Sequence, residues 1–341
     1  MSMRHKVDLV VVLALALCAV VVVGEYCTYY SDIHEYGSTA TWSDGRVDYT
    51  VSSSGSDVFS AILLENDGRK PVTDLCIFVD DGYMDYYAEA HGLSGAVYLD
   101  QEYYAKQVRE ALRFRGFSEV TQCSSPELSD HLRSTLSDPS GHALMVMSYS
   151  LPSEVYDGTD GCLLLEWMSE GGTLYWLGSE VGRFYTDGSS LVEVSGNQEI
   201  FFGVRCIHDC SMEVADTKVD NGFTDAFRFK NSSLQFALDS SVIDGAIPMG
   251  YSLDGYSSIV FVPFGSGQIC VFSGNFDVNQ IDDIGQVVAS GLTVDSEISC
   301  VQEGKVVRGT IEGSIDVPRA GCTLYIYTGG FYMNHGEAFH G

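Results

Sequence analysis

Hydrophobic residues follow two different rhythms along the chain. Between residues 25 and 70 polar and apolar positions alternate, as in "TATWSDGRVDYTVSSSGSDVFSAILLEND". Alternation with a period of two is typical of strands with one buried face. Asp44-Gly45 and Asn66-Asp67-Gly68 are turn signals between such strands. Residues 25–70 therefore predict a β-rich segment of a few antiparallel strands.

From residue 71 to residue 292, short apolar runs alternate with helical patterns. "VTDLCIFVDDG", "HALMVMSYS" and "TLYWLGSE" are continuous apolar runs, which are typical of strands buried on both faces. "QEYYAKQVREALRFRGF" predicts a helix that Gly116 ends, and "SPELSDHLRSTL" predicts one opened by Ser125 and Pro126. "SEVTQC" predicts a strand and "DGCLLLEWMSEGG" a third helix. The alternation predicts an α/β fold with a doubly wound, mostly parallel sheet.

The last third of the chain contains further strand patterns and one helix. "EIFFGVRCI" has a strand pattern, and "SSIVFVPFGSGQICVFSGNF" predicts two strands joined by Gly265-Ser266-Gly267. "DVNQIDDIGQVVASGL" predicts a helix that closes the α/β domain. Alternation and turns return after it, so residues 293–341 predict a small C-terminal β unit.

The N-terminus carries an export pattern. Arg4 and Lys6 precede an apolar run from Val7 to Val23 that only Asp8 interrupts. The run is near the short end of what crosses a bilayer as a transmembrane helix, and the basic flank places the N-terminus in the cytoplasm. A cleaved signal peptide and a retained signal anchor over residues 1–24 both fit this pattern. The absence of a small-x-small cleavage site favours the anchor. Either interpretation places the rest of the chain outside the cell membrane.

The net charge of the chain limits the classes of molecule that it is expected to bind. The chain has 18 Lys+Arg and 47 Asp+Glu, a formal net charge of −29. The electric field of so negative a chain repels phosphate groups, so nucleic acid is not an expected partner. It suits a solvated surface, cation binding or an extracytoplasmic setting. Asn231-Ser232-Ser233 is a glycosylation sequon that is usable only if the chain is exported.

Ten cysteines fit an oxidising compartment. Cys18 lies in the apolar N-terminal run, so nine remain and at least one thiol is unpaired. Cys76 and Cys270 sit in predicted strands, where a cysteine acts as a small hydrophobe. The close pair Cys206 and Cys210 would suit half of a zinc site, but no second pair has ligand spacing. A disulfide or two reduced thiols are favoured there.

Four stretches carry a resemblance to a known family: "DLCIFVDDG", "HALMVMSYSLPSEVYD", "LLLEWMSEGGTLYWLGSEVG" and "VPFGSGQICVFSGNF". On these stretches, residues 72–292 resemble the class I glutamine amidotransferase-like superfamily, including its catalytically diverged exported or membrane-attached members. The resemblance implies a flavodoxin-like, amidotransferase-like domain, here with flanking β elements.

In active members of that family, the strand after the glycine pair ends in a Gly-x-Cys-x-Gly elbow. The matching positions run from Gly178 to Gly182, with Glu180 in the place of the cysteine. A carboxylate is a poor acyl-transfer nucleophile, and His208 is not followed by the expected x-Glu. Ser179 lacks glycines two positions on either side, so it does not form a serine-hydrolase elbow. Amidotransferase activity is therefore not expected, and no catalytic residue is assigned.

Polar residues follow the ends of three predicted strands. In open α/β sheets, ligands bind beyond the carboxyl ends of the strands. The ligand-binding candidates are therefore Asp80, Asp81, Ser148, Ser150, Ser179 and Glu180. They would suit a cation, an amine or a sugar hydroxyl, and paired carboxylates would suit acid–base work on a glycan. The alternative is that they are turn residues at strand ends, with Glu180 held by the amides of a helix N-terminus.

These observations favour a membrane-anchored, extracytoplasmic protein with a non-catalytic amidotransferase-like domain. It would act as a binding or cell-envelope interaction module, with an envelope component or a carbohydrate as partner. No cofactor is expected. The strand-end carboxylates would nevertheless suit a divalent cation. The rival hypothesis is an extracytoplasmic hydrolase, carbohydrate-directed or cation-dependent, that uses those carboxylates. A third is a structural surface protein.

Overall fold

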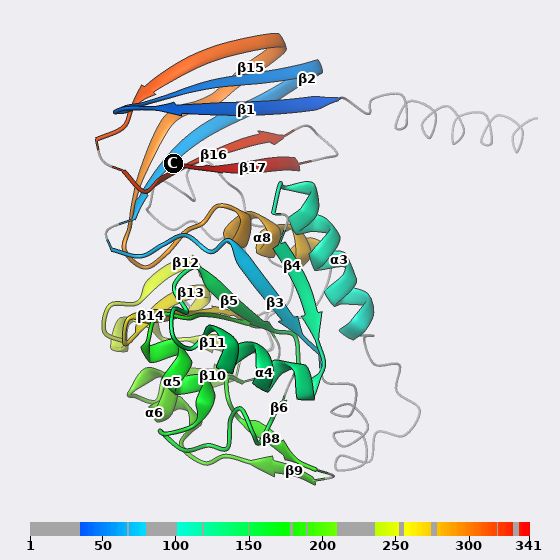
Figure 1. The fold of residues 1–341 in the computed structure, drawn as a ribbon, viewed down its shortest axis with the longest axis vertical. Helices are drawn as coiled ribbons and strands as arrows, with labels where there is room; N and C mark the ends of the chain where they lie inside the picture. Colours follow the sequence, from blue (N-terminus) through cyan, green and yellow to red (C-terminus); the bar gives the residue numbers. More distant parts are fainter. Residues whose placement is uncertain are drawn as a thin grey trace, which may run out of the picture.

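In the described residues, the computed structural model shows two large β-sheets and a small three-stranded one, with helices between and beyond the large sheets (Figure 1). It describes residues 35–66, 68–79, 101–117, 119–148, 150–177, 180–188, 190–209, 236–251, 256–273, 278–318, 320–329 and 334–341. In these segments, no helix is long and apolar enough to cross a membrane. The expected anchor over residues 1–24 lies outside them.

The larger sheet has five parallel strands at its centre and one edge. They are β3 (Asp74–Phe78), β4 (Glu119–Cys123), β5 (His142–Val146), β7 (Thr173–Leu177) and β14 (Gly267–Phe272). Their spatial order is β4-β3-β5-β7-β14, with parallel pairing throughout. Numbered along the chain this order is 2-1-3-4-5, one of the two common orders of doubly wound sheets. The predicted parallel sheet is confirmed for these strands.

Antiparallel strands extend this sheet beyond β14, so the sheet as a whole is mixed. The hairpin of β13 (Ser257–Phe264) and β14 turns at Gly265, as predicted. Strands β10 (Ile207–Asp209), β11 (Phe236–Leu238) and β12 (Ile247–Tyr251) pair antiparallel on the far side.

Helices cover both faces of the parallel strands. Helices α3 (Gln101–Phe114) and α8 (Val278–Ala289) pack on one face, and α4 (Ser125–Thr135) and α5 (Leu163–Ser169) on the other. All four agree with the predicted helices. The N-terminal cap of α4 lies one residue before the predicted one, because Ser124 and not Ser125 has the extended cap conformation. Its backbone N–H donates to Glu127 (2.8 Å), which closes a capping box.

Alternate side chains of each parallel strand enter opposite cores. In β3, Leu75 and Ile77 pack with α3 and α8, whereas Cys76 and Phe78 pack with α4 and α5. None of the four is more than 1% exposed. Double-sided burial explains why these strands appear in the sequence as unbroken apolar runs.

The second sheet is antiparallel and joins the two ends of the described chain. It contains β1 (Tyr36–Ser43), β2 (Arg46–Asn66), β15 (Ser296–Asp316), β16 (Cys322–Gly329) and β17 (Asn334–His340). Strand β15 follows one edge of β2 along its length, so β1 and β16 share the other edge. The strand patterns before residue 70 and after residue 293 thus belong to one sheet, a pairing that the sequence did not indicate.

Strand β2 links the two sheets because its alternate residues face different cores. Phe59 and Leu63 point into the antiparallel sheet's own core, whereas Ile62 and Leu64 pack with α3 and α8. Beside this contact, the buried Arg115 forms an ion pair with the partly buried Asp282 of α8. The two sheets are therefore joined through the helix layer of α3 and α8.

One predicted strand is wrong. The "EIFFGVRCI" stretch contains a short helix, α6 (Asn197–Phe202), and only its final residue belongs to β10. Gly196 and Gly203 bound the helix with φ of +86° and +70°, which glycine adopts without strain. The apolar run had indicated a strand because Phe201 and Phe202 both enter the core.

Candidate functional site

The carboxyl ends of β3, β5 and β7 lie side by side, because these strands are neighbours in the sheet. The predicted candidates Ser148, Ser150 and Glu180 are described at this edge. The remaining candidates, Asp80, Asp81, Ser179 and the sequon residue Asn231, lie outside the described residues. A small sheet of β6 (Ser150–Pro152), β8 (Phe184–Asp187) and β9 (Ser190–Glu193) lies at this end of the molecule (Figure 1).

The two candidate serines are buried. Ser148 and Ser150 are both 0% exposed. The Ser148 hydroxyl oxygen accepts the backbone N–H of Ser150 (3.3 Å), and Ser150 opens β6. These serines therefore shape the turn out of β5, and neither hydroxyl faces solvent.

Glu180 is the candidate that reaches the surface, and its carboxylate has partners on both oxygens. Oε1 accepts the side-chain amide N–H groups of Gln198 (2.9 Å) and Asn197 (3.3 Å). Oε2 lies 3.6 Å from Nη1 of Arg183, and the Glu180 side chain is 20% exposed. The carboxylate is thus held by two amides and a guanidinium.

The amides that hold Glu180 belong to the first two residues of α6 and serve other groups as well. Asn197 Nδ2 also donates to the carbonyl of Val181 (2.7 Å). Gln198 Oε1 accepts the backbone N–H groups of Cys206 and Ile207, each at 2.9 Å. A continuous hydrogen-bond network therefore ties the turn after β7 to α6 and to β10. The donors to Glu180 are side-chain amides, not the backbone N–H groups of a helix N-terminus.

Burial and three carboxylates affect the thiol of Cys206, beside this network. Burial, followed by the charges of Asp239, Glu180 and Glu199, raises the pKa of Cys206 to about 12. The thiol is therefore neutral at ordinary pH and is a poor metal ligand or nucleophile. Cys210 lies outside the described residues, and within them no group of three or more His, Cys, Asp or Glu residues is arranged to hold a metal.

The backbone at Glu180 differs from a nucleophile elbow. Such elbows hold the nucleophile in a strained turn between a strand and a helix. Among the described residues only glycines have positive φ, so Glu180 is not strained in this way. The segment that follows is the β8–β9 hairpin and not a helix. The described residues thus place no helix N-terminus directly after Glu180 to stabilise an oxyanion.

Charged side chains surround Glu180 at the surface. Arg183 bridges Glu180 and Glu193, with its Nη2 2.9 Å from Glu193 Oε1, and its guanidinium lies over the ring of Phe184. Arg205 forms an ion pair with Glu199 of α6 (2.7 Å). The arrangement presents alternating charges to solvent, and each of these carboxylates is paired with an arginine.

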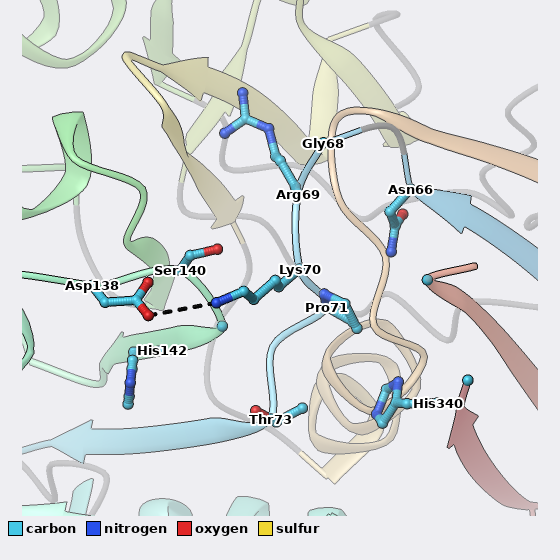
Figure 2. Close-up of a pocket in the computed structure, with 13 residues that line it drawn as sticks. Asn66, Gly68, Arg69, Lys70, Pro71, Thr73, Asp138, Ser140, His142 and His340 are labelled. Carbon is cyan, nitrogen blue, oxygen red and sulfur yellow. Dashed lines mark ion pairs between the residues drawn. The ribbon is translucent and has the colours of Figure 1, made fainter. Parts of the chain in front are cut away.

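A cavity lies at the opposite end of the parallel strands, near the amino ends of β3 and β5. It is lined by residues from four separated segments, among them Lys70, His142 and His340 (Figure 2). No sequence motif joins these segments, so the cavity was not predicted. The available signal was the cluster of Arg69 and Lys70 in an otherwise acidic chain.

No protein-family profile and no curated protein matches this chain. Among solved structures, it is similar to the cold-adapted β-galactosidase from Rahnella sp. R3, with 13% identity over 77% of this chain and 36% of that one, and a TM-score of 0.41. The β-galactosidase Gan42B from G. stearothermophilus gives 16% identity over 76% and 34%, with a TM-score of 0.39. The cytoplasmic protein STM1381 from Salmonella typhimurium LT2 gives 12% identity over 60% and 89%, with a TM-score of 0.36. This chain spans about a third of the length of these β-galactosidases. The TM-scores are low, and the similarities assign no function.

Replacing Gly182 tests the packing that supports Glu180. Gly182 has φ of +62°, and a Cβ there would overlap the ring of Phe201 and lie 2.9 Å from the hydroxyl of Tyr156. Gly188 has nearly the same φ, +63°, with nothing within 4 Å of its would-be Cβ. Both alanine variants carry the left-handed strain, about 1 kcal/mol. Only Gly182→Ala adds overpacking, about 2 kcal/mol more.

Urea unfolding of the full chain, followed by circular dichroism, should show this difference in the free energy of unfolding. Equal losses in Gly182→Ala and Gly188→Ala would mean that the turn after β7 is not packed against α6.

Proposed function

We propose that this chain is a membrane-anchored, extracytoplasmic protein whose α/β domain is a non-catalytic, amidotransferase-like binding module. Its binding surface is the one around Glu180 at the carboxyl ends of the strands. One observation carries the proposal: the carboxylate that replaces the elbow cysteine is held by Asn197, Gln198 and Arg183. A reacting group needs an oxygen available to a substrate, whereas these oxygens stabilise a turn.

The surface around Glu180 supports a binding role. Arg183 and Glu193 remain largely exposed despite their ion pair, at 45% and 61% of their side chains. Exposed ion pairs contribute little to stability, so a ligand can compete for them at small cost. Paired carboxylates and guanidinium groups offer both acceptors and donors to hydroxyl groups. A carbohydrate of the cell envelope is therefore the partner class that we propose.

The proposed location rests on the N-terminal export pattern, in which Arg4 and Lys6 precede the apolar run from Val7 to Val23. The strongly acidic composition is compatible with an extracytoplasmic surface.

Glu180→Ala tests the non-catalytic role. The full chain should release no ammonia from glutamine and should cleave no 4-nitrophenyl glycoside above the buffer rate, and Glu180→Ala should not differ. Glu193→Ala is the matched control, since Glu193 also pairs with Arg183. Turnover that is lost in Glu180→Ala and kept in Glu193→Ala would refute the proposal. A Ca²⁺-dependent rise in Tm that disappears in Asp81→Ala/Glu180→Ala would instead favour the cation-dependent hydrolase.

Protease accessibility tests the location. Protease added to intact cells should digest the full chain, and deletion of residues 7–23 should leave the protein protected until lysis, because the export segment is lost. A cytoplasmic marker protein controls for leakage. Protection of the full chain in intact cells, with digestion after lysis, would contradict an extracytoplasmic location.

A further inference from the structure

The cavity at the amino ends of β3 and β5 has a volume of about 600 Å³. That volume is within the range of small-molecule sites, roughly 300–1,000 Å³. We call it the junction cavity, because it lies where the segment from β2 to β3 passes between the two sheets (Figure 2). The lining side chains used below are those of Arg69, Lys70, Asp138, His142 and His340.

At two positions in the cavity wall, a glycine leaves the backbone uncovered by a side chain. Gly68 and Gly321 both line the cavity and have φ of +91° and +83°. A Cβ at either position would meet nothing within 4 Å. The missing side chains leave room for a ligand beside backbone polar groups.

The lining is less acidic than the chain as a whole. The whole sequence carries −29, whereas the cavity lining contains two cations, Arg69 and Lys70, and one acid, Asp138. His142 and His340 also line it, and burial lowers the pKa of His340. Arg69 is anchored by Asp295 and by the carbonyls of Ser266 and Gly267, so its guanidinium is fixed in place. Because Asp295 pairs with the Arg69 charge, Lys70 is the lining cation left to attract an anion.

Lys70 is the lining cation that is most available to a ligand. Its Nζ lies 3.5 Å from Asp138 Oδ2, with 63% and 72% of the two side chains exposed. Figure 2 shows the Lys70 side chain extending toward Asp138 along the cavity. An exposed ion pair of this length is weak, so the ammonium group can turn to an incoming anion.

Both cavity histidines are held through one ring nitrogen. His142 Nδ1 lies 2.7 Å from Asp74 Oδ2, and His340 Nδ1 lies 2.9 Å from Thr323 Oγ1. Such partners orient the ring and leave Nε2 for another group. Since Nδ1 of His142 faces the Asp74 carboxylate, its Nε2 donates to an oxyanion in the imidazolium form, in which both ring nitrogens carry a proton.

We propose that the junction cavity binds the carboxylate or phosphate group of a small polar molecule, with Lys70 and His142 as its principal contacts. The site is at the other end of the parallel strands from Glu180, so it is independent of the proposed carboxyl-end surface. Carboxylate and phosphate share the chemistry that these donors recognise.

Isothermal titration calorimetry of the full chain tests the site. The probes are sodium phosphate, sodium glucuronate and neutral glucose, at an ionic strength held constant with sodium chloride. Saturable binding of phosphate, glucuronate or both is expected, and the preferred probe identifies the group. Lys70→Ala and His142→Gln should each weaken binding about tenfold or more, the effect of losing a charge-assisted hydrogen bond.

Lys305→Ala is the matched control, because Lys305 is an exposed lysine on β15 and does not line the cavity. It should bind as the unmodified protein does. Lys70 is exposed, so its replacement should leave the fold intact even if His142→Gln does not. Absence of saturable binding by both anions, unchanged affinity in Lys70→Ala, or equal binding of glucose would overturn the proposal.

Discussion

Burial of both faces of the parallel sheet is the constraint on which the remaining structure depends. Side chains of β3 alternate between the core under α3 and α8 and the core under α4 and α5, so neither face is free for polar chemistry. The two clusters of polar groups with access to solvent that are described above therefore lie at the strand ends. The carboxyl ends carry the network around Glu180, and the amino ends carry the junction cavity.

At the carboxyl ends, the turn after β7 carries a carboxylate, Glu180, where the proposed amidotransferase-like fold would place a thiolate. A thiolate nucleophile would need open space and a helix N-terminus for its oxyanion. Glu180 instead accepts hydrogen bonds from α6 and is followed by a β-hairpin. Bonds to a charged acceptor are stronger than those between neutral groups, so the carboxylate suits a structural role. This is the physical basis for our proposal of a binding module without turnover.

The sequence predicted those features that depend on local periodicity. The strands β3, β5 and β7 and the helices α3 and α8 follow from apolar runs and helical spacing, because burial dictates both patterns. The helix α6 was missed, since adjacent Phe201 and Phe202 resemble a strand and only the flanking glycines indicate otherwise. Contacts between distant segments were beyond prediction. The pairing of β2 with β15 and the junction cavity both depend on them, as do the partners of Glu180.

The coupling between Glu180 and Gln198 tests most directly whether the carboxylate is a structural group. A double-mutant cycle would compare the free energies of unfolding of the unmodified chain, Glu180→Ala, Gln198→Ala and the double variant. Residues in one hydrogen-bond network couple by roughly 0.5–3 kcal/mol. We expect about 1.5 kcal/mol, because the acceptor is charged. Additive effects, within about 0.3 kcal/mol, would contradict the account and leave Glu180 available for another role.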